Sequence, residues 1–309
     1  MMDVVTVCHT PELHLLKLQA RSIAQHLQPD DVGRLWVVLN EPVPGQARDY
    51  FDRHIAHEYG QFIDHVVVVG RDELLRRVPV HRSRWGWRMQ QVLKLRVACR
   101  IGSPCYLILD AKNHFIRRVS VNSFFDGSTR FRSHLTSHSG AMDEAFRASF
   151  AYFGLNADEF ISRSPPSITP FGVRTARVRE LLDQIEQREN ECFECFFMRP
   201  KQTVTEFFLI QALILASAGT LQHDFVFGRR SMITLFQSLE QSTDGFRILL
   251  DAARDPSICT FAMHRSVLGR LSAGTKTLVS ELWQNASLLT DHGEIDLFTN
   301  PFDSKSLRQ

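Results

Sequence analysis

The residues with the clearest chemical potential lie around Asp110, which directly follows the apolar run at residues 105–109. A carboxylate fixed at the end of a buried strand can bind a hard divalent cation or a ribose hydroxyl. An amide or a second carboxylate two or three residues later can complete such a site, and Lys112 and Asn113 occupy these positions. A second interpretation is that Asp110 only caps the turn after the strand. The local sequence supports both.

Polar residues also follow the other apolar runs that we expect to form strands. In an open parallel sheet, ligands bind beyond the carboxyl ends of the strands. The residues at these ends are His9 and Thr10, then Asn40 and Glu41, then Gly70, Arg71 and Asp72. We therefore expect His9, Thr10 and Asn40 to lie in the same ligand-binding region as Asp110.

The elements that would position these residues alternate between strands and helices. Apolar runs typical of parallel strands covered on both faces occur at residues 4–8, 35–39, 62–69 and 105–109. Thr10, Pro11 and Glu12 fit the N-cap and first turn of a helix, and a second helix is expected at residues 46–59. This order predicts an α/β, Rossmann-like fold with a mostly parallel central sheet flanked by helices.

Further elements follow the fourth strand without a linker that would divide the chain. Residues 71–85 are polar and arginine-rich, and we expect a loop there over one end of the sheet. Expected helices lie at residues 87–101, 175–187, 203–217 and 272–289, and expected strands at residues 168–173, 225–226 and 259–263. We predict a single domain over residues 1–290 and a polar C-terminal tail over residues 291–309.

The composition excludes several classes of protein. The net charge is +2, with basic residues matched by acidic ones, so we expect no nucleic-acid partner. The longest apolar run, residues 207–219, is interrupted by Gln211 and is too short to span a bilayer. We also expect no signal peptide, because no charged segment followed by an apolar one opens the chain. The cysteines are irregularly spaced, which favours reduced thiols and a cytoplasmic location.

Several segments together resemble a known family. They are WGWRMQQVLKL from Trp85, CYLILDAKNHF from Cys105, the opening VVTVCHTPELHLLKLQARSI, and the short segments ITPF from Ile168 and TEF from Thr205. This combination is similar to a bacterial glycosyltransferase-like family of largely unassigned function, related to the GT-A nucleotide-sugar glycosyltransferases. Its pattern is G-W-x-x-Q-Q-x-x-K-L, then an apolar strand that ends in a metal-binding D-x-D motif or a variant of it.

The resemblance implies a GT-A-like fold and a sugar transfer. A nucleotide-diphosphate sugar would be the donor and a saccharide, glycan or other hydroxyl compound the acceptor, in a process such as bacterial surface polysaccharide synthesis. By resemblance, Gln90, Gln91 and Lys94 line the donor-sugar pocket. Helical spacing alone puts Trp87, Gln91 and Lys94 on one helix face, where the alternative is a solvated polar stripe.

The resemblance also bears on the metal. A complete D-x-D motif would have Asp at position 112, where this chain has Lys112. Asn113 could be the second oxygen ligand beside Asp110, with Mn²⁺ or Mg²⁺ bound, or Lys112 could offer positive charge to the diphosphate directly. GT-A enzymes often place a late histidine on the metal or diphosphate, and His264 has that position; its alternative is an ordinary surface histidine. Arg265 could contact phosphate oxygens.

Glu206 has two interpretations. Thr203 and Glu206 have the spacing of a capping box, in which the glutamate reaches back to the start of the helix. By resemblance, an acid in T-E-F near a helix start lies in the acceptor pocket, where it could accept the proton of the attacking hydroxyl. The two roles are partly compatible, because a helix N-terminus in a pocket is polar. Glu206 and Asp110 are thus the candidate catalytic residues.

Other functions remain as alternatives. A transferase fold that binds a nucleotide sugar without turnover is one, and Lys112 would fit it. A nucleotidyltransferase ranks below it, since that class usually has a glycine-rich basic loop after the first strand, unlike Cys8 to Pro11. The chain has no P-loop or dinucleotide fingerprint. Cys192 and Cys195 have no second cysteine pair or close histidine pair to complete a zinc site, so we expect buried thiols.

Overall fold

The computed structural model describes residues 1–41, 45–77, 85–235 and 243–302. Residues 78–84 of the predicted loop and residues 303–309 of the predicted tail lie outside the described residues. At the centre is a five-stranded sheet with the order β3-β2-β1-β4-β7. Its strands are β1 (Met2–Cys8), β2 (Val32–Leu39), β3 (Val66–Gly70), β4 (Cys105–Asp110) and β7 (Phe171–Arg174).

The first four strands are parallel, and β7 pairs with β4 in the antiparallel direction. Every residue of β1 is buried, including the polar Asp3 and Thr6, as its mostly apolar sequence predicts for a strand covered on both faces. The expected mostly parallel α/β sheet is therefore confirmed. Register brings Val7 level with both Val38 and Asp110, so the polar residues after these strands share one edge of the sheet.

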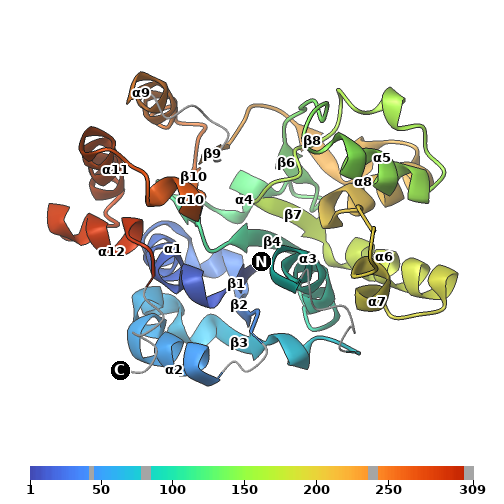
Figure 1. The fold of residues 1–309 in the computed structure, drawn as a ribbon, viewed down its shortest axis with the longest axis horizontal. Helices are drawn as coiled ribbons and strands as arrows, with labels where there is room; N and C mark the ends of the chain where they lie inside the picture. The colour runs from blue at the N-terminus through green and yellow to red at the C-terminus, as the bar shows by residue number, and fades with distance from the viewer. Residues whose placement is uncertain (42–44, 78–84, 236–242, 303–309) are drawn as a thin grey trace.

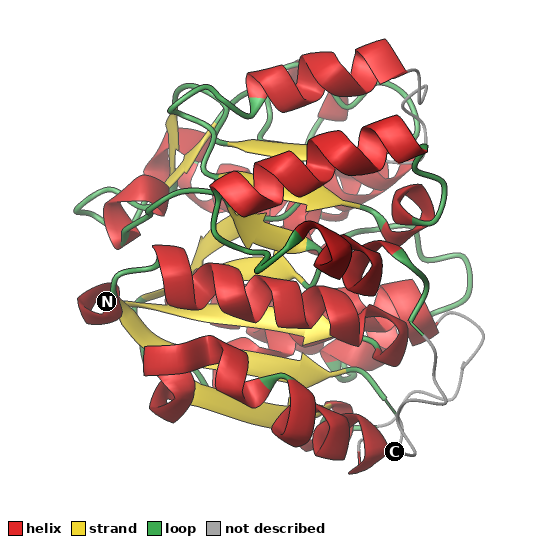
Figure 2. Ribbon diagram, turned by 90° about the vertical axis from the view of Figure 1, so that its left-hand side faces the viewer, coloured by secondary structure: helices red, strands yellow, loops and turns green. Residues whose placement is uncertain are grey.

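Helices cover both faces of this sheet. Figure 1 shows α1 (Leu13–His26) and α3 (Trp85–Arg96) on opposite sides of the first strands. Figure 2 shows the strands stacked behind a layer of helices. The remaining helices are α2 (Gly45–His54), α4 (Val121–Phe124), α5 (Asp143–Tyr152), α6 (Thr175–Glu189), α7 (Phe193–Phe197), α8 (Glu206–Ala218), α9 (Thr243–Ala252), α10 (Arg265–Leu268), α11 (Ala273–Asn285) and α12 (Ile295–Thr299).

Two small sheets extend the fold beyond β4. One has the order β5-β10-β9 and consists of β5 (Asn113–Phe115), β10 (Thr260–Met263) and β9 (Met232–Leu235). The other pairs β6 (Phe131–Ser133) with β8 (Phe225–Phe227). Strand β5 directly follows the turn at Asp110 and pairs with β10. The C-terminal part of the chain that carries β10 therefore lies beside the end of β4.

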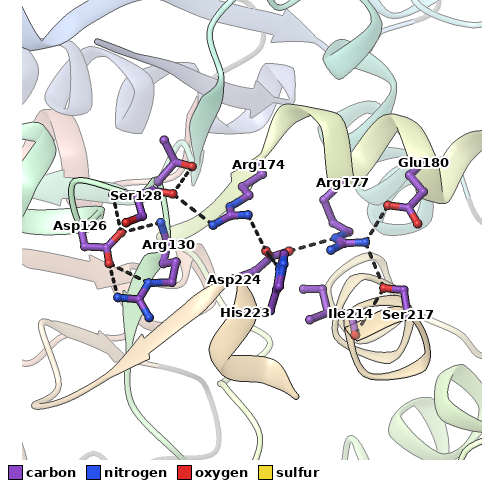
Figure 3. A network of polar contacts seen from close by, with 11 residues as sticks. Asp126, Ser128, Arg130, Arg174, Arg177, Glu180, Ile214, Ser217, His223 and Asp224 are labelled. Carbon is purple, nitrogen blue, oxygen red and sulfur yellow. Dashed lines mark hydrogen bonds and ion pairs between the residues drawn. The ribbon is translucent and has the colours of Figure 1, made fainter. Parts of the chain in front are cut away.

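A polar network fixes the edge of the fold where β7, α6 and α8 meet. Asp224 accepts from Arg174 at 3.2 Å and from Arg177 at 3.0 Å, and Arg177 also contacts Ser217 of α8 (Figure 3). Asp224 is only 6% exposed. Because a buried carboxylate is costly unless it is paired, these contacts tie the sheet edge to the neighbouring helices.

Some predicted boundaries are wrong. The strand expected from Phe62 begins only at Val66, because residues up to His65 belong to a 3₁₀ segment, Ala56–His65. The helix expected at residues 46–59 ends at His54. Thr10 is no helix N-cap, since His9 caps a short 3₁₀ segment that precedes α1.

The capping box predicted at the start of α8 is also wrong. This helix begins at Glu206 with Thr205 as its N-cap, so Thr203 and Glu206 do not have the required positions. The strand expected from residue 168 begins at Phe171. No helix in the described part of the chain is long and apolar enough to cross a membrane.

Candidate active site

A cavity of about 310 Å³ opens at the carboxyl end of β4. Its walls come from α3, from the turn after β4, from residues 167–169 and from the first turn of α8. The predicted site residues that line it are Trp87, Gln90, Gln91, Lys94, Asp110, Lys112, Glu206 and His264. Residues distant in sequence thus converge on one site at the edge where open α/β sheets bind ligands.

The Asp110 carboxylate is the centre of the charged groups in this cavity. Its Oδ1 lies 2.8 Å from Lys94 Nζ, and its Oδ2 pairs with Lys112 Nζ and accepts from the Thr169 hydroxyl at 2.9 Å. Burial acts to raise the pKa of Asp110, but the charges of Lys112 and Lys94 outweigh it and hold that pKa well below its usual range. Asp110 is therefore ionised.

Backbone and amide contacts fix the turn that carries Asp110. Asn113 Oδ1 accepts from the Asp110 N–H at 2.7 Å, and its Nδ2 donates to the Thr169 carbonyl at 3.1 Å. Gln19 Nε2 donates to the carbonyls of both Asp110 and Asn113 at 2.8 Å, and Thr6 donates to Gln19 Oε1. Sequence analysis missed Gln19; its signal was an amide within the apolar face of α1.

Lys94 joins the two candidate catalytic carboxylates. Its Nζ lies 2.8 Å from Asp110 Oδ1 and 3.4 Å from Glu206 Oε1, and the side chain of Lys94 is nearly inaccessible to solvent. Burial works against the charged ammonium, but the carboxylates of Asp110 and Glu206 outweigh it and raise the pKa of Lys94. Lys94 therefore keeps its charge inside the protein.

Glu206 differs from Asp110 in its affinity for protons. It is the first residue of α8, 5% exposed, and faces the cavity beside Phe207. Burial raises the pKa of Glu206, Lys94 opposes this, and the charge of Asp110 adds to it, so the result lies above the usual value. Two carboxylates whose pKa values are pushed apart are a common arrangement for acid–base chemistry.

Polar atoms without partners face the same cavity. Both amide atoms of Gln91, the hydroxyl of Thr205 and the hydroxyl of Thr234 are buried and have no hydrogen-bond partner among the described residues. An unpaired buried polar group costs about 1–3 kcal/mol. A polar ligand in the cavity would satisfy these groups.

His114 supports the backbone of Lys112 from behind. The indole N–H of Trp283 donates to His114 Nε2 at 2.6 Å. Because indole can only donate, the ring proton of neutral His114 lies on Nδ1, which is 3.3 Å from the Lys112 carbonyl. Burial lowers the pKa of His114 to about 3, so the ring stays neutral.

The residues predicted to bind a divalent cation do not fit one. Asn113 does not line the cavity and its amide oxygen is occupied by the Asp110 N–H, while both oxygens of Asp110 are paired with ammonium groups. His264 Nδ1 accepts from the Ser266 N–H at the start of α10, which puts the ring proton of the neutral side chain on Nε2, so Nε2 has no lone pair for a metal. No group of three His, Cys, Asp or Glu side chains suited to a metal occurs among the described residues.

Besides Asn113, four predicted donor-site residues lie outside the cavity lining. His9 Nε2 and Asn40 Nδ2 lie 3.2 Å apart and both contact the Gly86 carbonyl, which connects the strand ends to the start of α3. The Thr10 N–H donates to Glu41 at 2.8 Å. Arg265 is exposed. The polar groups of His9, Thr10 and Asn40 thus hold neighbouring segments together.

A family model described as a family of unknown function, DUF6492, matches residues 9–238. The chain belongs to the DUF6492 family. The DUF6492 match includes α3, the end of β4 and the start of α8, and therefore the Lys94, Asp110, Lys112 and Glu206 cluster. A search of curated proteins gives no match.

Glycosyltransferases are among the solved structures similar to this DUF6492 chain. An active-site mutant of LgtC matches with a TM-score of 0.50 at 11% identity, over 96% of this chain and 100% of that one. The bifunctional glycosyltransferase WbbM matches with a TM-score of 0.50 at 9% identity, over 96% of this chain and 51% of that one. These likenesses show the fold, which is that of the GT-A glycosyltransferases, as the sequence resemblance implied.

Proposed function

We propose that this protein transfers a sugar from a nucleotide-diphosphate sugar to a hydroxyl acceptor. The observation that carries the proposal is the cavity at the end of β4, where Asp110, Lys94, Lys112 and Glu206 meet. It combines fixed positive charge for a diphosphate with a carboxyl group of raised pKa for an acceptor hydroxyl. The unpaired atoms of Gln91, Thr205 and Thr234 support the same proposal, because a sugar offers many hydroxyl partners.

The chain's own lysines supply the charge that binds the donor. Lys112 contacts the diphosphate oxygens with its ammonium group. Lys94 lies between the carboxylates of Asp110 and Glu206 and adds a second positive charge. Preorganised charge aimed at a leaving group is among the largest contributions to enzyme catalysis. A divalent cation has no place in this proposal, since both Asp110 oxygens are already paired with ammonium groups.

The reaction consists of one substitution at the anomeric carbon. The acceptor hydroxyl gives its proton to Glu206 and forms a bond to that carbon, while the bond from the carbon to the diphosphate oxygen breaks. The nucleoside diphosphate leaves with the electron pair of that bond, and Lys112 stabilises the new negative charge. Positioned proton transfer by a carboxylate contributes about 10²–10⁴-fold in rate.

A thermal-shift screen with nucleotide sugars tests the proposal. A ligand at ~100 times its dissociation constant stabilises the folded state by about 2.7 kcal/mol, which a melting curve detects. We expect one nucleotide sugar to raise the melting temperature equally with EDTA and with added Mn²⁺. Stabilisation that requires Mn²⁺ would contradict the role given to Lys112. Tight binding without any release of nucleoside diphosphate would favour the non-catalytic binding protein.

A further inference from the structure

A second hollow adjoins the cavity at Asp110. It has a volume of about 510 Å³ and lies between the start of α3, the start of α5 and residues 202–203 before α8. Trp87 and Met142 line both spaces and form the boundary between them. Any group bound in this hollow is therefore a neighbour of the cavity that holds Glu206.

Trp87 is the most unusual feature of this boundary. Its side chain is 60% exposed, whereas large aromatic side chains are normally mostly buried. On its hollow side lie the small or apolar residues Ala141, Met142 and Ala145. An exposed indole beside an apolar wall offers a flat surface on which the C–H face of a sugar ring can stack.

Polar groups lie at the rim of the same hollow. The side chain of Glu144 has no hydrogen bond or ion pair within the described part of the chain, and Gln202 and Thr203 line the hollow just before α8. A ring that stacks on Trp87 would leave its edge hydroxyls free to bond with these groups. An apolar surface with a few polar groups at its edge is the usual composition of a small-molecule site.

We infer that this hollow is the acceptor subsite and that it binds an uncharged saccharide by stacking on Trp87. The inference rests on the proposed function, because only a transferase needs an acceptor beside its donor cavity. Glu144 and Gln202 bond the hydroxyls of the stacked ring, and the boundary at Trp87 and Met142 directs one hydroxyl toward Glu206. The same hollow excludes acceptors that lack an apolar ring face.

The first test measures saccharide binding without any donor. The tryptophan fluorescence of the protein is titrated with methyl glycosides of glucose, galactose, mannose and N-acetylglucosamine, and with glycerol and cyclohexanol as controls. We expect a saturable change with at least one glycoside in the millimolar range, absent from Trp87→Phe. A change with cyclohexanol alone, or no change with any glycoside, would overturn the subsite.

The second test fills the hollow without altering the donor cavity. Ala145 lines only the hollow, so Ala145→Phe should weaken glycoside binding at least tenfold and leave stabilisation by a nucleotide sugar unchanged. Glu144→Gln keeps the shape and removes the charge, and we expect a threefold or greater weakening of glycoside binding. Unchanged glycoside binding in both variants would refute the site. If glycosides bind but no nucleotide sugar does, the saccharide site stands, whereas the proposed transfer and the acceptor role of the hollow both fail.

Discussion

The replacement Glu206→Gln gives the sharpest test of the catalytic arrangement. Glutamine keeps the size of the side chain at the start of α8 but cannot accept a proton. We expect kcat to fall about 10²–10⁴-fold, which corresponds to about 3–5 kcal/mol in the activation barrier at about 1.4 kcal/mol for each factor of ten. Donor binding should be unchanged, because Lys112 and Asp110 remain in place.

The structure also predicts what this replacement does to stability. Lys94 loses the negative charge of Glu206, whose Oε1 lies 3.4 Å away, but keeps Asp110 at 2.8 Å, so no buried charge is left without a partner. The free energy of unfolding should therefore change by no more than about 1.5 kcal/mol. Glu194→Gln is a matched control, because Glu194 is a buried carboxylate paired with Arg96 and lies outside the cavity. It should lower stability and leave kcat near that of the unmodified protein.

The assay is release of nucleoside diphosphate at saturating donor and acceptor across a pH series. A base must be deprotonated, and the pKa of Glu206 is raised above its ordinary value of about 4.3. The rate should therefore rise with pH through that elevated pKa, and Glu206→Gln should remove this dependence. A variant with full kcat and the same pH profile would refute the assignment of Glu206 as the base.

Three further replacements examine the charges and the frame. Asp110→Asn should lower the free energy of unfolding by about 3 kcal/mol, because Lys94 and Lys112 lose their shared partner. It should also weaken stabilisation by a nucleotide sugar, because the two ammonium groups are no longer held in place; unchanged donor affinity in calorimetry would argue against this positioning role of Asp110. Lys112→Ala should weaken donor binding about 10- to 100-fold, because a charge-assisted bond of about 1.5–3 kcal/mol is lost. Rescue of donor binding by Mn²⁺ would show that a metal ion can take the role given to Lys112. Asp224→Ala should lower the free energy of unfolding by about 3 kcal/mol, because Arg174 and Arg177 lose their ion-pair partner. Titrations below the melting temperature should show an unchanged donor affinity.

The buried strands could be predicted because their sequences satisfy a simple physical requirement. Both faces of β1 and β4 are covered by other elements, so nearly every position in them must be apolar. The polar residue Asp110 then marks the end of the buried part of β4. The start of β3 could not be predicted in this way. Phe62 is fully buried within a 3₁₀ segment. A buried position requires an apolar residue in a 3₁₀ segment as it does in a strand, so the sequence does not distinguish the two.

The part of the candidate site that lies on a single helix could be predicted from the sequence. Helical spacing puts Trp87, Gln91 and Lys94 on one face, and these three residues line one cavity. The contact of Lys94 with Glu206 joins residues that are far apart in sequence, and no local pattern contains that information. Asn113 shows the opposite problem, because its amide has the chemistry of a ligand but is used to fix the turn at Asp110.

Release of nucleoside diphosphate from a panel of uridine, guanosine, cytidine and thymidine diphosphate sugars tests the central claim most directly. The measurement uses the full chain with a mixture of simple glycosides as acceptors and with EDTA present throughout. The account predicts that one donor is consumed with EDTA present, that a glycoside gains its sugar, and that Glu206→Gln and Lys112→Ala both suppress the release. Failure of every donor to bind or to release its nucleoside diphosphate, with EDTA or with Mn²⁺, would contradict the account.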